Sequence, residues 1–242
     1  MFAQADKPYI LRETDDWAAL YKPPGMETVS QEGKGDLLGQ AKGMLTCPGL
    51  KPAHRLDRDT SGAQLFAKTD VAEKDLTRLF RHRQVGKKYF ALCLGAPRNR
   101  TGVINRNLSE WDGGRRPVRV VKKGGLEAST SYEMLAVSKT LAGDWKISAL
   151  AFAPHQGRTH QIRVHAAAIG YPILGDDQYG DRLANKKARE HFGLKRQALH
   201  SWSLDFVWTG ERIRIACPLP SDIGAILESG FDAPVMEQLL KM

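Results

Sequence analysis

The feature that most constrains the fold of this chain is a series of short apolar segments separated by tight turns. Residues 198–208, ALHSWSLDFVW, alternate apolar and polar side chains, and residues 211–218, ERIRIACP, resume the alternation after Thr209-Gly210. A period of two is typical of a β-strand with one buried face, and a two-residue connection that contains glycine is typical of a hairpin. This stretch therefore predicts two antiparallel strands.

Further apolar segments, bounded by turn residues, also predict strands. They are WAALYK (17–22), AQLFAK (63–68), KYFALCLG (88–95), STSYEMLAV (129–137) and WKISALAFA (145–153), and a loop with Gly143 and Asp144 separates the last two. WAALYK stops at Pro-Pro-Gly, which predicts a tight turn directly after this strand.

Fewer segments have the spacing of a helix. Leu76, Leu79 and Phe80 lie at positions i, i+3 and i+4, which predicts an amphipathic helix that ends near Gly86. The spacing of these apolar residues places them on one face, where they can pack against a sheet.

Three more helices are predicted in the second half of the chain. Thr159 is a candidate N-cap for a short helix, HQIRVHAAAI, and Gly170 follows at the position where a left-handed residue ends a helix. Two short helices are expected after these, one following Ser221 and one at 232–240.

The order of these elements predicts the fold class. Strands outnumber helices and arrive in hairpin-like runs, without strict strand–helix alternation. Such an order is typical of the α+β class, here a mixed, largely antiparallel central sheet with flanking helices and loops. No repeat or low-complexity linker interrupts the 242 residues, so we expect one domain, 1–242. No G-x-G-x-x-G or Walker loop follows a strand, which argues against a dinucleotide or P-loop site.

The charge of the chain indicates a class of partner. The 36 Lys and Arg against 27 Asp and Glu give a net charge of +9, which favours a polyanion. Phosphate contacts position a nucleic acid without selecting its sequence. Clustered cations therefore predict that the partner is a nucleic acid, but they do not indicate which one. The cations gather in three groups, which are RLFRHRQVGKK (78–88), RRPVRVVKK (115–123), and Lys186, Lys187, Arg189, Lys195 and Arg196.

Compartment and membrane association also follow from the sequence. No apolar run approaches the ~20 residues of a spanning helix, and the N-terminal MFAQADKPYILRETDDW is acidic where a signal peptide is basic and apolar. Cys47, Cys93 and Cys217 lie far apart without C-x-x-C spacing, which predicts buried thiols and neither disulfides nor a zinc site. We therefore expect a cytoplasmic protein with no membrane association.

Residues 54–62, HRLDRDTSG, place Asp57 in a polar turn ahead of an apolar strand. A turn held by a rigid scaffold can aim a side chain for chemistry, although a solvated surface turn has the same composition. Asp59 lies two residues further on, so the two carboxylates would suit a glycoside hydrolase. The chain has no aromatic sugar platform, however, and its basic charge suits a polyanion better.

A second polar stretch occupies residues 155–180. Its histidines, His155, His160 and His165, do not have the i, i+4 spacing of ligands on one helical face, so we expect no metal. Arg163 lies one turn into the predicted helix and requires an anion if it is buried. Asp57 is a candidate for that anion, and the pair could serve either structure or catalysis.

The same segments resemble the signatures of the RluA-type pseudouridine synthase family. HRLDRDTSG resembles the second signature, H-R-L-D-x-x-T-S-G, and GKKYFALCLG resembles the K-x-Y segment. GRTHQIRVHAAAIGYPILGDDQYG resembles the third signature, and ALHSWSLDF the L-H-x-x-x-L-x-F segment that follows it. YKPPG resembles the opening V-N-K-P-x-G, with Tyr21 in place of Asn. The segments occur in the family's order between about residues 10 and 217.

This resemblance implies the pseudouridine synthase catalytic fold and an isomerase that converts specific uridines of ribosomal or transfer RNA to pseudouridine. The reaction uses base flipping and a catalytic aspartate, and neither a cofactor nor a metal. The implied partner is an RNA loop that contains the target uridine, and we expect a monomer. The alternative is a catalytically inactive RNA-binding protein or RNA chaperone on the same scaffold.

The resemblance also implies roles for individual residues. Asp57 is the essential carboxylate, and Arg163 is its salt-bridge partner. Tyr89 stacks on the flipped uracil and is a candidate for the proton transfer at C5. The remaining expected substrate-binding residues are Ile162 and Leu199, as apolar walls, and Arg55, which fills the gap left in the RNA stack or holds the backbone nearby.

Overall fold

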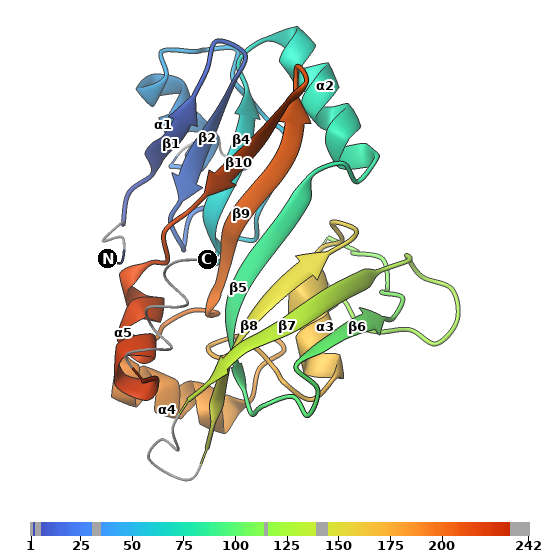
Figure 1. The fold of residues 1–242 in the computed structure, drawn as a ribbon, viewed down its shortest axis with the longest axis vertical. Helices are drawn as coiled ribbons and strands as arrows, with labels where there is room; N and C mark the ends of the chain where they lie inside the picture. Colours follow the sequence, from blue (N-terminus) through green and yellow to red (C-terminus); the bar gives the residue numbers. More distant parts are fainter. Residues whose placement is uncertain (1, 3–5, 31–34, 114–115, 139–144, 233–242) are drawn as a thin grey trace. The chain divides into compact units, whose positions relative to one another are not determined.

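The computed structural model describes residues 2, 6–30, 35–113, 116–138 and 145–232. Within these residues the chain forms ten strands and five helices, which confirms the predicted α+β class (Figure 1). The chain divides into two compact units. Of the described residues, unit 1 comprises Phe2 and those within 89–199 and 221–232, and unit 2 comprises those within 6–88 and 200–220.

Unit 2 is a mixed sheet in the order β1-β2-β4-β9-β10, with β3 paired to β4. Its strands are β1 (Tyr9–Glu13), β2 (Trp17–Lys22), β3 (Lys51–Pro52), β4 (Ser61–Ala67), β9 (Leu199–Trp208, of which Leu199 belongs to unit 1) and β10 (Glu211–Ala216). The pairs are antiparallel except for β4 and β9, which run parallel through Ser61↔His200 and Gly62↔Ser201.

Strand β2 is buried at all six positions because other elements cover both of its faces. Its odd-numbered residues pack into an apolar cluster with α2 (Asp70–Arg81), β9 and β10. Ala18 and Leu20, which face the other way, pack into a second cluster with α1 (Leu37–Met44). A strand covered on both faces is apolar at nearly every position, which explains the uninterrupted apolar run in WAALYK.

Unit 1 is an antiparallel sheet in the order β5-β8-β7-β6 (Figure 1). Helix α3 packs against β7 and β8, and α4 packs against α5. The bounds are β5 (Gly86–Leu94, of which Gly86–Lys88 belong to unit 2), β6 (Thr101–Asn105), β7 (Ser129–Val137), β8 (Ile147–Pro154), α3 (Gln161–Ala168), α4 (Arg182–Phe192) and α5 (Ser221–Gly230).

Each predicted strand is present in the structure, and the predicted turn chemistry is confirmed. The β9–β10 hairpin turns at Thr209 and Gly210, whose φ angles of 47° and 88° are both positive, as a two-residue hairpin turn requires. Gly170 follows α3 with a φ of 85°, the predicted left-handed conformation. Cys93 and Cys217 are buried as predicted, and Cys47 is half-buried.

Two predicted helix ends are wrong. Helix α2 ends at Arg81 and not near Gly86, because the chain turns through a left-handed Arg83 with a φ of 60° and Gly86 already begins β5. Helix α3 is not capped by Thr159. Its N-cap is His160, which is itself left-handed, with a φ of 58°, and makes no side-chain capping hydrogen bond.

Two helices of the structure were not predicted, and one predicted helix cannot be compared with it. Helices α1 and α4 were not predicted, whereas the helix expected after Ser221 is α5. The predicted helix at 232–240 and the predicted loop with Gly143 and Asp144 lie outside the described residues, apart from residue 232. None of the helices that the structure describes combines the length and the apolar character needed to cross a membrane.

Candidate active site

Asp57 lies in the turn between β3 and β4 of unit 2 and is half-buried. Its carbonyl oxygen accepts a hydrogen bond from the backbone N–H of Thr60 at 3.1 Å. Before it, the backbone N–H of Leu56 donates to Oγ1 of Thr28 at 3.3 Å. The backbone on both sides of Asp57 is therefore held in place, as a reactive side chain requires.

Lys22 of the YKPPG segment is hydrogen-bonded to the turn that contains Asp57. Its ammonium group is fully buried and donates to the carbonyl oxygens of Pro23, Met26 and Arg58 at 3.0, 2.7 and 2.8 Å. A buried charge is costly unless hydrogen bonds replace its water shell. These bonds hold the residue that directly follows Asp57, so the YKPPG segment has a structural role beside this turn.

His54, at the start of the same signature, is a structural residue. Its Nε2 accepts a hydrogen bond from the backbone N–H of Leu65 at 3.1 Å, and its ring stacks on Phe80. Desolvation, and secondly the charge of Lys87, lower the pKa of His54 to about 3. The ring is therefore neutral at pH 7 and carries its proton on Nδ1.

Ser61 and Gly62 join the second signature to the L-H segment of β9. The hydroxyl of Ser61 lies 2.9 Å from Nδ1 of His200, whose Nε2 lies 3.2 Å from the carbonyl oxygen of Cys217. A carbonyl only accepts, so Nε2 carries a proton and Nδ1 of a neutral ring accepts from Ser61. Gly62 has a φ of 122°, and a Cβ there would overlap the backbone of Ser201.

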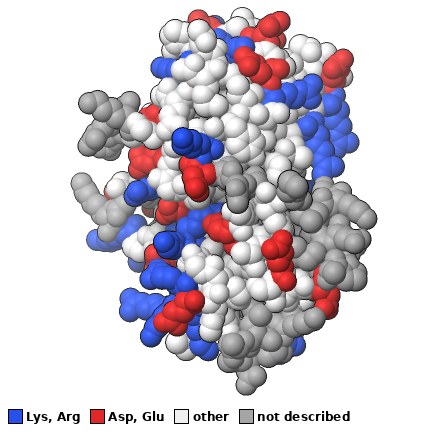
Figure 2. Space-filling view, turned by 90° about the vertical axis from the view of Figure 1, so that its left-hand side faces the viewer, with Lys and Arg blue, Asp and Glu red and all other residues white. Residues whose placement is uncertain are grey.

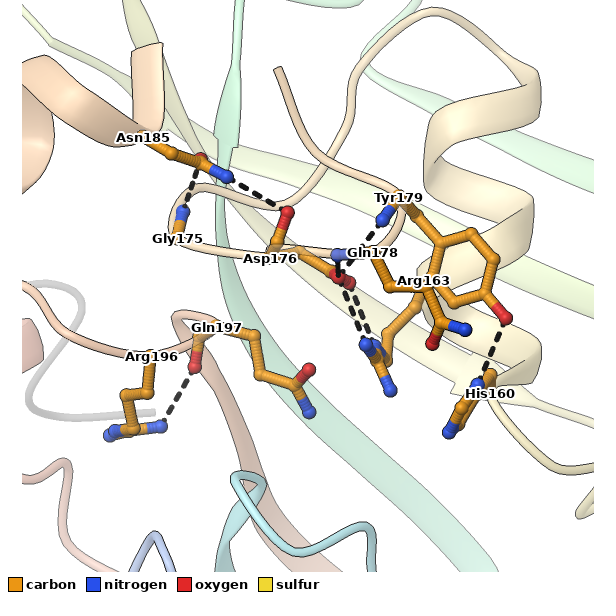
Figure 3. Close-up of polar contacts among 9 residues, drawn as sticks. All are labelled: His160, Arg163, Gly175, Asp176, Gln178, Tyr179, Asn185, Arg196 and Gln197. Carbon is orange, nitrogen blue, oxygen red and sulfur yellow. Dashed lines mark hydrogen bonds and ion pairs between the residues drawn. The ribbon is translucent and has the colours of Figure 1, made fainter. Parts of the chain in front are cut away.

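In unit 1, Arg163 forms a bidentate ion pair with Asp176, which was not predicted (Figure 3). Nε donates to Oδ2 at 2.7 Å and Nη2 donates to Oδ1 at 2.9 Å. The side chains are 10% and 0% exposed. Oδ1 also accepts from the backbone N–H groups of Gln178 and Tyr179, at 3.0 and 3.1 Å. The guanidinium carbon lies 5.1 Å from the centre of the Tyr179 ring, which adds a cation–π contact.

The three histidines of the 155–180 stretch are hydrogen-bonded to different groups. Desolvation lowers the pKa of His165, so its ring is neutral at pH 7. Among the residues that the structure describes, no three His, Cys, Asp or Glu residues come together as a metal site would require. The partners are Ser131 for His155, Tyr179 for His160, and Thr130 with the carbonyl oxygen of Arg106 for His165.

The predicted residues Tyr89, Ile162 and Leu199 are all buried in unit 1. Tyr89 lies on β5 opposite Phe152 of β8, and Ile162 lies on α3 directly before Arg163. Leu199 begins β9, and its carbonyl oxygen accepts from Nη1 of Arg196 at 3.1 Å. Unit 1 therefore supplies four of the six predicted site residues, counting Arg163.

Unit 2 supplies the other two, Asp57 and Arg55. Arg55 is exposed, as a group that meets RNA should be. Asp59 is also exposed. The salt bridge between Asp57 and Arg163 stays a prediction.

The cationic groups differ in how far acidic residues already neutralise them. On the face drawn in Figure 2, Lys and Arg side chains lie in several places beside Asp or Glu. Arg196 is buried and forms a bidentate pair with Asp222 at 2.7 and 2.9 Å, so it is structural. In the same group, Lys186 lies 3.9 Å from Glu190 and Arg189 lies 3.7 Å from Asp177. Arg78 of the 78–88 group also lies 3.0 Å from a carboxylate, that of Asp75. Arg119, Lys122 and Lys123 of the 115–123 group are exposed cations that phosphates could reach.

Comparison with known sequences gives consistent matches. The family model described as RNA pseudouridylate synthase matches residues 16–168. Ribosomal large subunit pseudouridine synthase D of Nitrosomonas europaea is 34% identical over 94% of this chain and 66% of its own length. The dual-specificity RNA pseudouridine synthase RluA of Haemophilus ducreyi is 35% identical over 75% of this chain and 86% of its own length. The chain spans about two thirds of the length of several of these curated relatives, the Nitrosomonas europaea protein among them.

Two solved human structures have a similar fold. Human RNA pseudouridylate synthase domain containing 1 matches with a TM-score of 0.75 and 25% identity, over 100% of this chain and 98% of that one. Human RNA pseudouridylate synthase domain containing 4 matches with a TM-score of 0.74 and 28% identity, over 90% and 91%. The matched sequences and structures thus carry the same family description.

Proposed function

The chain belongs to the RluA-type RNA pseudouridine synthase family, and we propose that it isomerises specific uridines of ribosomal or transfer RNA to pseudouridine. The observation that carries this proposal is the turn of Asp57, whose signature residues have defined structural partners. The second signature is thus present both as sequence and as a hydrogen-bonded turn.

Asp57 supplies the chemistry in this proposal. The reaction cuts the N1–C1′ bond of uridine, turns the uracil and rejoins it through C5. A carboxylate can serve either as a nucleophile or as a base that removes a sugar proton. Either role requires an ionised side chain in a fixed orientation. The hydrogen bonds at Leu56 and Thr60 hold the backbone from which this side chain projects.

The other site residues act on the flipped base in this proposal. Tyr89 stacks on the uracil and takes part in the proton transfer at C5, and Arg163 keeps Asp57 ionised. Their similarity to the family's signature positions supports these roles, as does their burial. The residues proposed to complete the substrate site are Ile162 and Leu199 as apolar walls and Arg55 beside the RNA backbone.

Base flipping explains why the protein is basic. Extrusion of a nucleotide costs a few kcal/mol, and stacking of a base on an aromatic side chain recovers ~1–3 kcal/mol. Phosphate contacts supply much of the remaining affinity. A loop is the favoured target, because its bases are already partly unstacked.

Tritium release tests the proposal. RNA labelled with tritium at C5 of uridine should lose its label to water when incubated with the protein, because C5 becomes the glycosidic carbon. Ribosomal and transfer RNA transcripts should be assayed separately. Binding without release from any transcript would favour the inactive RNA-binding alternative, which the names of the matched relatives do not support.

RNA binding should weaken steeply with salt. The log–log slope should be about −0.7 per phosphate neutralised on single strands. Replacement of Arg119, Lys122 and Lys123 by Ala should make the slope less negative by up to about 2, since each removes one exposed cation. Filter binding at several salt concentrations measures this.

The matched control is the double replacement of Lys186 and Arg189 by Ala. Both side chains already face carboxylates, so their loss should change the slope little. A flat salt response of the unchanged protein would contradict the phosphate-binding role of the cationic groups.

We further propose a cytoplasmic monomer in which residues 1–242 act as one catalytic domain. Burial raises the pKa of the Cys93 and Cys217 thiols, which keeps them protonated and unreactive. Such cysteines suit a reducing compartment. Because we propose a monomer, light scattering of the purified protein should give the mass of a single chain.

A further inference from the structure

Asn185 of α4 joins this helix to the loop that holds Arg163 (Figure 3). Its Oδ1 accepts a hydrogen bond from the backbone N–H of Gly175 at 2.7 Å, and its Nδ2 donates to the carbonyl oxygen of Asp176 at 2.8 Å. The side chain is buried. The oxygen and the nitrogen of the amide therefore both bind the backbone, one at Gly175 and the other at Asp176.

The loop around Asp176 is tightly closed. The backbone N–H of Gly180 donates to the carbonyl oxygen of Asp176 at 2.9 Å. A Cβ on Gly180 would overlap that same oxygen and crowd Nδ2 of Asn185. Gly175 has a φ of 76°, and a Cβ there would overlap the carbonyl oxygen of Arg196. The loop thus has little room to shift while these contacts persist.

The first turn of α4 sets the position of Asn185 itself. Asp181 caps the helix, with its Oδ1 accepting from the backbone N–H of Ala184 at 2.8 Å. The carbonyl oxygen of Asp181 accepts from the backbone N–H of Asn185 at 2.9 Å. A capped helix start is a rigid platform for a side chain in its first turns.

We propose that Asn185 is a positioning residue that holds the Arg163 guanidinium, through Asp176, in the orientation that isomerisation requires. This inference rests on the proposed function, in which Arg163 acts at the active site. The amide fixes the backbone of Asp176, the carboxylate of Asp176 binds Arg163 at two nitrogens, and the guanidinium cannot turn without breaking both bonds. Helix α4 is therefore a support of the active site.

The first test measures Arg163 directly and does not depend on activity. Hydrogen exchange of the Arg163 Nε–H can be followed by ¹⁵N NMR, with the signal assigned by its loss in Arg163→Lys. Asn185→Ala should speed this exchange about tenfold or more. The matched control is Ala188→Gly, which loosens the same helix at a buried position without removing either contact of the amide.

The comparison of these two variants decides the inference. Ala188→Gly should leave the exchange of the Arg163 Nε–H unchanged even if its thermal midpoint falls as far as that of Asn185→Ala. Equal exchange rates in the two variants would overturn the proposal, because they would show a general loosening of the unit. If Asn185→Ala does not fold, Asn185→Asp replaces it, since it keeps the acceptor for Gly175 and loses the donor to Asp176.

The second test uses single-turnover tritium release. Asn185→Ala should lower the rate constant about 10- to 100-fold, as small misplacements in active sites do, with RNA affinity unchanged within about twofold. In an Asp176→Asn background, the same replacement should cause no further loss. Additive losses would overturn the proposal. If the unchanged protein releases no tritium from any RNA, the proposed function fails, and the exchange measurement still decides whether Asn185 holds Arg163.

Discussion

Asp57→Asn should abolish tritium release while the protein still binds RNA. Asn has no negative charge and is a poor nucleophile and base, so the rate should fall by about 10⁴-fold or more. Affinity should stay within about twofold, because it arises mainly from phosphate contacts. The fold should persist, because the backbone bonds at Leu56 and between residues 57 and 60 do not use the carboxylate. Single-turnover assays and filter binding measure both quantities.

Asp59→Asn is the matched control. It removes the same charge two residues further along the same turn, from an exposed position. Its rate should remain near that of the unchanged protein. If Asp57→Asn retains turnover, or if the Asp59 variant loses as much, the catalytic assignment of Asp57 is wrong.

Asp176→Asn should cause the largest loss of stability among the substitutions considered. It would leave the buried Arg163 guanidinium without the carboxylate that binds two of its nitrogens. Removal of one partner of a buried ion pair typically costs about 3 to 5 kcal/mol. Urea denaturation followed by circular dichroism should show this as a lower midpoint. Tritium release should fall as well, since Arg163 would lose its orientation.

Asp205→Asn provides a control with the same chemistry at the surface. Arg212 also binds Asp205 through Nε and Nη2, but its side chain is 78% exposed and that of Asp205 is 31% exposed. Water can replace the lost interaction there, so the urea midpoint should hardly change. Equal losses in the two variants would contradict the view that burial makes the Asp176 pair important.

Seven strands were predictable because their signals are local, whereas β1, β3 and β6 were not predicted. The β9–β10 hairpin shows period-two alternation around Thr209-Gly210, and both features act within a few residues of the chain. The start of α3 was not predictable in this way. A capping rule selects Thr159, whereas the chain turns through a left-handed His160, a conformation that is unusual for residues other than glycine.

Helix α4 was missed because its buried side is made of small or polar residues. Ala184, Asn185 and Ala188 are its buried positions, so no stripe of large apolar side chains marks the helix in the sequence. Its N-cap, Asp181, was a local signal that could have indicated it.

The role of Asp176 could not be read from the sequence for a related reason. The third signature contains two adjacent acids, and the structure buries Asp176 and exposes Asp177. Nothing local distinguishes them, because the choice depends on the ion pair with Arg163, thirteen residues away. The second signature itself was recognisable because its residues are contiguous, while Lys22 and Thr28, which bind its backbone, come from a distant segment.

The discontinuity of unit 2 has a consequence for protein synthesis. Ser61 and Gly62 of β4 pair with residues 200 and 201, and residues 89–199, which lie between, belong to unit 1. At ribosomal speeds of about 5–20 residues per second, the partner strand emerges on the order of ten seconds after β4. During that interval part of the nascent sheet has an open edge, which other chains can pair with.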